Sequence, residues 1–360
     1  MSLHGIGKRL FGLIWPAERQ RRVAHGRLRG PVDHVIVLDG TMSSLKPGHE
    51  TNAGLTYRLL SEVGAPVSVY YEAGVQWQDW RSTHHVLLGR GVNRQIKRAF
   101  GYLASRYRPG DRIFFFGYSR GAYAVRSLAG ILDAVGLLRA QMATERNVEQ
   151  AYRLYQQGAG SETLAAFRKA YCHAQVDVEM VGVWDTVKAL GAPFLPRIFK
   201  DTHGFHNHQL GAAVRHGYQA LALHETRVVF EPVLWECPKD WQGRVEQVWF
   251  PGTHGDVGGQ VAGDTPARLL SNIPLVWMLE KAERCGLPLP ENWRLRYAQD
   301  PLAKSVGTWA GWGKLFWVRA RRRVGYGACE SLHESVEARA LAAGVAPSSP
   351  KISARARVAR

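Results

Sequence analysis

Ser119 lies in the pattern Gly-x-Ser-x-Gly, between an apolar run typical of a strand (113–116) and a segment with helical periodicity. Gly117 and Gly121 lack side chains, so a strand and a helix can pass close together on either side of the serine. This context predicts a sharp strand-to-helix turn that exposes a nucleophilic Ser119 hydroxyl beside a helix N-terminus. That location favours the negative charge of an oxyanion. The alternative is a small serine that only fits a glycine-rich turn.

Two further strand-like runs end in residues that can assist a serine nucleophile. The run 178–184 ends at Asp185, and the run 245–250 leads into a glycine-rich loop that contains His254. A nucleophilic serine needs a base and a carboxylate that orients the base. We therefore predict that His254 takes the serine proton and returns it to the leaving group. Asp185 is expected to fix the imidazole tautomer and to stabilise the imidazolium.

These assignments have simpler alternatives. Asp185 could cap the next helix, and backbone groups could satisfy His254. Asp256, two residues after His254, competes with Asp185 as the orienting acid, although we favour an Asx-type turn that supports the glycine-rich loop. Glu225 and Arg227 are expected to form an internal ion pair near this loop rather than to take part in the chemistry.

An acyl-transfer site also needs two backbone N–H groups that stabilise the oxyanion. One is expected from Arg120, the residue after the nucleophile. The other is expected from Gly40 or Thr41, which follow the apolar run 35–38. Asp39 is expected to organise this loop, and its place at the end of a strand also leaves a metal role open.

The sequence gives little support for a metal or a cofactor, and we predict neither. His206 and His208 could form a zinc site with a carboxylate, but their spacing is generic. A weaker alternative is a metal-dependent hydrolase built on Asp39, His254 and Asp256. The four cysteines show no Cys-x-x-Cys spacing, so we expect neither a zinc site nor disulfides, and reduced thiols in a cytoplasm are the default.

Strand-like and helical segments alternate along most of the chain. Strands are expected at 34–38, 67–71, 112–116, 178–184 and 245–250. Helical periodicity marks 51–63, 92–107, 121–135, 145–157, 162–173, 210–223 and 266–285. This alternation predicts an α/β fold with a mostly parallel central sheet and helices on both faces. Sites in such sheets lie at the carboxyl ends of the strands, where the candidate triad residues are found.

The net charge of +17 is concentrated at the two ends of the chain. Residues 1–30 carry seven Lys and Arg against one Glu, and residues 319–360 carry nine against three. Strongly basic ends suggest contact with phospholipid headgroups or nucleic acid, although solvated tails are the simpler alternative. No apolar run approaches the length of a membrane span, and the run 10–15 lacks the features of a signal peptide. A cytoplasmic location is therefore expected.

The expected organisation has three parts: a basic N-terminal extension (1–30), a catalytic domain (31–337) and a basic, disordered tail (338–360). Two segments could cover the site as lids, 188–207 and 305–318. The second is rich in tryptophan and glycine and precedes a basic run, which would suit insertion at an anionic membrane interface. The alternative is an ordinary hydrophobic flap packed on the core.

Four motifs in this order resemble those of a bacterial and fungal α/β-hydrolase family that includes phospholipase effectors of type VI secretion. Residues 117–122 are similar to its Gly-Phe-Ser-Arg-Gly-Ala elbow, and residues 38–41 resemble its opening motif. Residues 182–187 are similar to its acid motif and residues 249–259 to its histidine motif, which supports the choice of Asp185 and His254. The resemblance covers roughly residues 33–337 and implies an α/β-hydrolase-like fold.

By resemblance, we expect a serine esterase or lipase of phospholipase A type that cleaves phospholipids or other lipid esters without a cofactor. The resemblance also suggests export by a specialised secretion system and a secretion or immunity partner, and the basic segments suggest peripheral contact with an anionic membrane. Our alternative is a non-catalytic protein of the same fold that binds nucleic acid or a membrane through its basic ends. We do not favour nucleic acid as a partner, because all three triad residue types are present in the required order.

Overall fold

The computed structural model describes residues 29–74, 90–158, 162–187, 209–237, 244–309, 317–325, 327 and 329–344. The chain divides into two units, Met1–Pro31 and Val32–Arg360, and the fold below is that of the second unit. Several expectations lie outside the described residues. These are the N-terminal extension up to residue 28, the lid 188–207, His206 and His208, and residues 310–316 of the other lid.

Seven strands form one sheet in the order β2-β1-β3-β4-β5-β6-β7, and every neighbouring pair is parallel. The strands are β1 (Asp33–Leu38), β2 (Val67–Glu72), β3 (Arg112–Tyr118), β4 (Val178–Trp184), β5 (Val214–Ala222), β6 (Arg244–Phe250) and β7 (Glu330–Leu332). The register pairs Leu38 with Gly117 and Tyr118 with Trp184. Strands β1, β3 and β4 therefore end at the same edge of the sheet.

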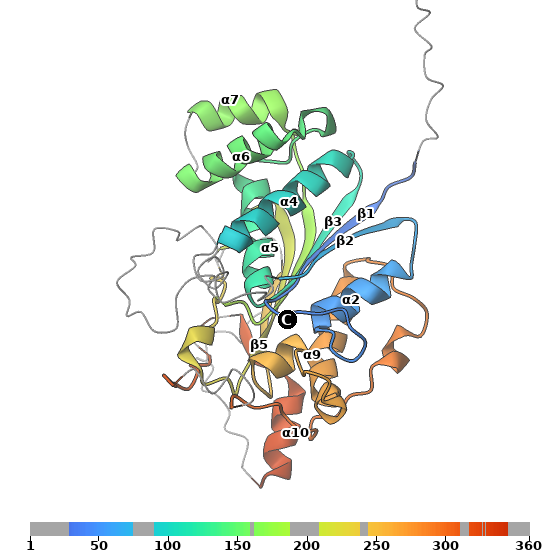
Figure 1. Ribbon diagram of the computed structural model, residues 1–360, viewed down its shortest axis with the longest axis vertical. Helices are drawn as coiled ribbons and strands as arrows, with labels where there is room; N and C mark the ends of the chain where they lie inside the picture. Colours follow the sequence, from blue (N-terminus) through green and yellow to red (C-terminus); the bar gives the residue numbers. More distant parts are fainter. Residues whose placement is uncertain are drawn as a thin grey trace, which may run out of the picture. The chain divides into compact units, whose positions relative to one another are not determined.

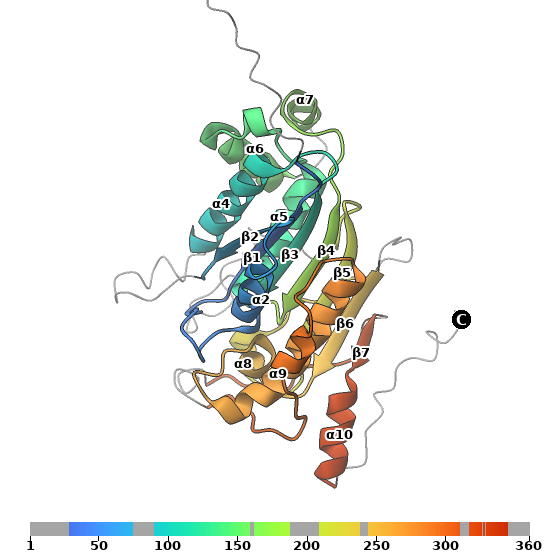
Figure 2. The same cartoon turned by 90° about the vertical axis from the view of Figure 1, so that its right-hand side faces the viewer.

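Helices cover both faces of this sheet (Figures 1 and 2). One face carries α4 (Arg90–Arg106) and α5 (Arg120–Ala134), with α6 (Glu145–Gln157) and α7 (Glu162–Tyr171) beyond them. The other carries α2 (Asn52–Ser61) and α9 (Thr265–Arg284). The remaining helices are short: η2 (Ala140–Met142), η3 (Val228–Phe230), α8 (His254–Gly258), η4 (Trp293–Arg296) and α10 (Glu334–Ala342).

Strand β3 shows how the sequence builds two apolar layers. Phe115 packs in the cluster under α4 and α5, whereas Phe114 and Phe116 pack in the cluster under α2 and α9. Successive side chains of a strand point to opposite faces of the sheet, so a run of three phenylalanines supplies both layers. The predicted α/β architecture with a parallel sheet and helices on both faces is confirmed.

The prediction of a helix at 210–223 is wrong, because this segment contains strand β5. Its apolar residues Leu210, Val214, Tyr218 and Leu221 have spacings that also fit one face of a helix. In the structure, β5 pairs with β4 on one side and β6 on the other. A strand that is buried on both faces carries apolar residues without alternation, so periodicity does not separate it from a buried helix.

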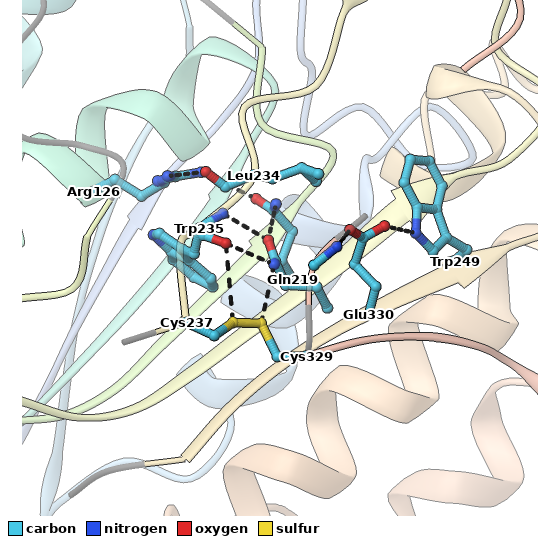
Figure 3. The surroundings of a disulfide bond; sticks show 10 residues. Arg126, Gln219, Leu234, Trp235, Cys237, Trp249, Cys329 and Glu330 are labelled. Carbon is cyan, nitrogen blue, oxygen red and sulfur yellow. Dashed lines mark hydrogen bonds between the residues drawn. A yellow bond between two sulfur atoms is a disulfide. The ribbon is translucent and has the colours of Figure 1, made fainter. Parts of the chain in front are cut away.

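The expectation of four reduced cysteines is also wrong, because Cys237 and Cys329 form a disulfide bond (Figure 3). The two residues are 92 positions apart in the sequence, and their Cα atoms are 6.3 Å apart. The sheet brings them together, because Cys329 directly precedes β7, which pairs with β6, and Gln247 of β6 donates to Cys329 Sγ at 3.3 Å. Local spacing carries no signal for such a pair. Cys172 and Cys285 are free and buried.

The C-terminal boundary of the folded part also moves. Helix α10 (Glu334–Ala342) continues past residue 338, where we expected the disordered tail to begin. The rest of that tail, residues 345–360, lies outside the described residues. None of the helices in the described ranges is long and apolar enough to cross a bilayer.

Candidate active site

Ser119 joins β3 to α5 in a backbone conformation that non-glycine residues rarely adopt, with φ 57° and ψ −121°. Both flanking glycines are required by close packing. A Cβ on Gly117 would lie 2.7 Å from Ala122 Cα, and one on Gly121 would lie 2.1 Å from the Leu38 carbonyl oxygen. Strained backbone of this kind persists where the surrounding structure enforces it, and it is common at functional sites.

The three candidate residues lie in one hydrogen-bonded row. His254 Nε2 is 2.9 Å from Ser119 Oγ, and His254 Nδ1 is 2.6 Å from Asp185 Oδ2. Ser119 is 6% exposed, His254 5% and Asp185 0%, so the row is shielded from bulk water. Ser119 follows β3, Asp185 follows β4, and His254 begins α8 after β6. The structure thus brings together residues that three separate strand ends supply.

The Asp185 carboxylate accepts four hydrogen bonds. Besides His254, the Ala222 N–H donates to Oδ1 at 2.9 Å, and Arg322 donates to both oxygens, at 2.5 Å to Oδ1 and 2.9 Å to Oδ2. Burial by itself would raise the pKa of Asp185. The Arg322 charge and the hydrogen bonds from His254 and Arg322 outweigh burial and hold that pKa well below its usual range. Asp185 is therefore ionised wherever the protein is folded near neutral pH.

Aromatic rings and a buried ion pair fix the imidazole of His254. Phe230 stacks on it with ring centroids 4.6 Å apart, and Tyr118 packs against it at 4.9 Å. The backbone N–H of His254 donates to Glu225 at 3.1 Å. Glu225 in turn pairs with Arg227 at 2.6 Å, so the predicted internal ion pair is confirmed.

Asp256 contacts other groups than the imidazole. Its Oδ2 accepts the N–H of Thr253 at 2.7 Å and the hydroxyls of Thr253 at 2.9 Å and Ser305 at 2.5 Å, while Oδ1 accepts the Val306 N–H at 2.9 Å. The first of these bonds is part of a capping box at the start of α8. Asp256 therefore organises the His254 loop and ties residues 305–306 to it.

The loop after β1 lies beside the nucleophile. A Cβ on Gly40 would come within 3.3 Å of Ser119 Cβ and 2.7 Å of the Tyr118 ring. The Gly40 N–H, however, donates to Asp39 Oδ1 at 2.7 Å, so it is already engaged. Of the two expected donors in this loop, the geometry favours Thr41.

The side chain of Asp39 stabilises the loop after β1 through hydrogen bonds. Its Oδ2 accepts the hydroxyls of Thr51 at 2.7 Å and Tyr71 at 2.8 Å. Burial raises the pKa of Asp39 to about 6, although hydrogen bonds from Thr51, Gly40 and Tyr71 oppose the rise. The predicted organising role is thus matched by its contacts.

The three residues of the weaker metal alternative have separate partners. Asp39 contacts the β1 loop, His254 contacts Ser119 and Asp185, and Asp256 contacts its own loop. Among the residues that the structure describes, no group of three or more His, Cys, Asp or Glu side chains could hold a metal ion.

Comparison with known families matches residues 33–281 to the model described as "T6SS, Phospholipase effector Tle1-like, catalytic domain". This range contains β1 to β6 and most of α9, and with them Ser119, Asp185 and His254. The chain belongs to this Tle1-like family.

Individual relatives are distant. The chain is 26% identical over 224 residues to Uncharacterized protein YEL023C of Saccharomyces cerevisiae, which covers 55% of this chain and 32% of that protein. An uncharacterised protein from Pseudomonas aeruginosa aligns with a TM-score of 0.47 at 16% identity, over 75% of this chain and 49% of that one. The Tle1 effector bound to the VgrG spike aligns with a TM-score of 0.41 at 14% identity, over 76% and 77%. The chain thus spans about a third of the yeast protein and half of the Pseudomonas protein.

The sequence analysis did not identify one residue of the candidate site, Arg322, which lies beyond the end of the Tle1-like match at residue 281. Arg322 lies in the basic run 319–323, for which we considered contact with an anionic membrane or an ordinary flap packed on the core. Its side chain is 5% exposed and contacts Asp185, whereas Arg321 and Arg323 are exposed. A run of arginines contains no periodic signal that separates the one that points inward from its neighbours.

Proposed function

We propose that this protein is a serine hydrolase that cleaves carboxylic ester bonds of phospholipids through an acyl-enzyme. The observation that carries the proposal is the buried hydrogen-bonded row Ser119–His254–Asp185. It has the order and polarity that nucleophile, base and orienting acid require.

In the first half of the proposed reaction, Ser119 Oγ attacks the ester carbonyl carbon while His254 Nε2 takes the hydroxyl proton. Asp185 accepts the Nδ1–H bond, which fixes the tautomer with a free Nε2 and stabilises the imidazolium. Collapse of the tetrahedral intermediate breaks the C–O bond of the ester, and the imidazolium gives its proton to the leaving alcohol. In the second half, His254 takes a proton from a water molecule as its oxygen attacks the acyl carbon. The bond between this carbon and Ser119 Oγ then breaks, the imidazolium returns the proton to Oγ, and the fatty acid is released.

The oxyanion needs two preorganised donors. We assign them to the backbone N–H groups of Arg120 and Thr41. The Arg120 N–H is at the first position of α5, where N–H groups have no partner within the helix. Thr41 belongs to the loop that contacts the nucleophile, and Gln260 holds its carbonyl from the His254 loop at 3.1 Å.

Two features support a phospholipid rather than a neutral ester. The side chain of Arg120, the residue after the nucleophile, is partly buried, and burial lowers its pKa to about 10. No carboxylate among the described residues pairs with it, so a headgroup phosphate would supply the missing anion. The second feature is an exposed apolar patch (Val228, Val229, Trp309, Trp317 and Val318) with exposed fractions of 39% to 82%.

This apolar patch adjoins the site. The Val228 N–H donates to the Val318 carbonyl, and Phe230 of the same turn stacks on His254. Arg321 and Arg323 are exposed on the segment that carries Trp317 and Val318. Apolar side chains flanked by cations suit the interface of an anionic bilayer, which would present lipid next to Ser119.

Family membership supports export as an effector, and it raises secretion and immunity proteins as partners. The disulfide Cys237–Cys329 supports the same proposal, because such bonds persist in oxidising compartments and are rare in a reducing cytoplasm. We therefore propose that the protein acts outside the cytoplasm in which it is made.

The test is fatty-acid release from phospholipid vesicles, together with labelling by a fluorophosphonate probe. Ser119→Ala is expected to lose labelling and at least about 10⁴-fold in hydrolysis while its thermal unfolding is unchanged. The wild-type rate is expected to rise with the anionic lipid content of the vesicles.

Full hydrolysis by Ser119→Ala would overturn the proposal. Salt-sensitive retention of nucleic acid without probe labelling would favour the non-catalytic alternative instead.

A further inference from the structure

We propose that Arg322 is a positioning residue that holds the catalytic carboxylate and keeps the His254–Asp185 pair from taking up a proton in mildly acidic solution. This inference rests on the proposed serine hydrolase function. Arg322 acts through Asp185, to which both of its terminal nitrogens donate.

The geometry is that of a buried, bidentate ion pair. Both terminal nitrogens of Arg322 donate to Asp185, at 2.5 and 2.9 Å, and the same nitrogens donate to the carbonyls of Ala222 and Phe230. The side chain is 5% exposed and that of Asp185 is 0% exposed. The planar fork of an arginine fixes the plane of a carboxylate in a way that a lysine does not. Arg322 therefore sets the direction in which Asp185 Oδ2 faces His254.

The charge of Arg322 raises the free energy of adding a proton to the His254–Asp185 pair. His254 Nδ1 and Asp185 Oδ2 share one hydrogen bond of 2.6 Å, so a charge on either group acts directly on the other. A nearby cation in a shielded site disfavours a further positive charge on that pair. Whichever of the two groups takes the extra proton, His254 ceases to act as the base. Arg322 therefore extends the active range toward acidic pH.

Other charged groups around the pair do not provide this cation. Glu225 and Arg227 face His254 from the segment after β5 and form an ion pair with each other at 2.6 Å. Asp256, from α8, accepts its hydrogen bonds from Thr253, Ser305 and Val306. Tyr118, from β3, stays neutral because burial raises its pKa well above the usual value.

A purely structural role would give a different result. Arg322 also fastens residues 317–325 to the sheet through its two carbonyl contacts. If that were its whole role, its removal would lower stability but would not change the pH at which activity begins. The pH profile separates the two.

The experiment measures the second-order rate of fluorophosphonate labelling from about pH 5 to about pH 9, since this rate reports the Ser119 nucleophile whatever the natural lipid is. Arg322→Gln is expected to move the acidic limb to higher pH by about 1 unit and to lower the plateau by up to about 10²-fold. Arg153→Gln removes a charge of the same sign from an exposed residue of α6, and its profile is expected to match the wild type.

Arg322→Lys keeps the charge and loses the bidentate fork, so it is expected to lower the plateau and leave the limb close to its wild-type position. It also keeps the test decisive if Arg322→Gln does not fold. An unmoved limb in Arg322→Gln, an equal shift in Arg153→Gln, or a shifted limb with a full plateau in Arg322→Lys would overturn the inference. A wild type that does not label at any pH would instead remove the proposed function, and this inference with it.

Discussion

Residues 33–281 (the motif segment) and residues 317–344 (the C-terminal segment) contribute to one site in different ways. The first carries the proposed nucleophile, base and acid in motifs that can be read along the chain. The second carries no motif that predicts chemistry. It nevertheless supplies Arg322, the disulfide-bonded residue Cys329, and β7, the last strand of the sheet. In the proposed reaction, the motif segment supplies the reacting groups, and the C-terminal segment supplies the arginine that contacts one of them.

The largest effect should separate the two acids of the motif segment. Asp185→Asn is expected to lower kcat by about 10⁴-fold, because the imidazole loses its tautomer and its counter-charge. Asp256→Asn should lower kcat far less and act mainly on stability, since its contacts lie within the loop. The rates of fatty-acid release and the urea unfolding curves of both variants test this. A greater loss of kcat in Asp256→Asn would reverse the two assignments.

The next largest effect is expected from the disulfide bond that links the C-terminal segment to the motif-bearing part of the fold. Replacing Cys237 and Cys329 by Ser is expected to lower the free energy of unfolding by about 2–5 kcal/mol, as for other disulfides that close long loops. Urea unfolding with and without reductant measures it. Reductant should destabilise the wild type to the level of the double variant and leave that variant unchanged. A wild-type unfolding curve that reductant leaves unchanged would instead indicate that both cysteines are free thiols.

The smallest effect concerns Asp39 in the motif segment, whose pKa burial raises from 3.8 to about 6. Between these values the folded protein binds more protons than the unfolded chain, so this group makes stability fall as pH rises. The wild type should lose up to about 3 kcal/mol relative to Asp39→Asn between pH 4 and pH 7. Urea unfolding of both proteins across this range measures the difference, and a constant difference would contradict the shifted titration.

The sequence predicted the candidate site best where a motif and the end of a strand coincide. The elbow around Ser119 and the runs before Asp185 and His254 each combine a residue type with a context, and the structure brings these three residues within hydrogen-bond distance. It failed at β5, where a doubly buried strand looks like a helix, and at Cys237–Cys329, where the pairing depends on strand order.

The sequence by itself determined the α/β architecture, the order of the reactive residue types and the need for glycine on both sides of Ser119. These depend on local patterns, because periodicity, turn chemistry and residue type are properties of short segments. Only the tertiary structure decided that Arg322 faces inward while Arg321 and Arg323 face solvent, and that the Gly40 N–H is engaged by Asp39. The direction of one arginine in a basic run depends on a buried carboxylate 137 residues away, and that contact exists only once the sheet is assembled.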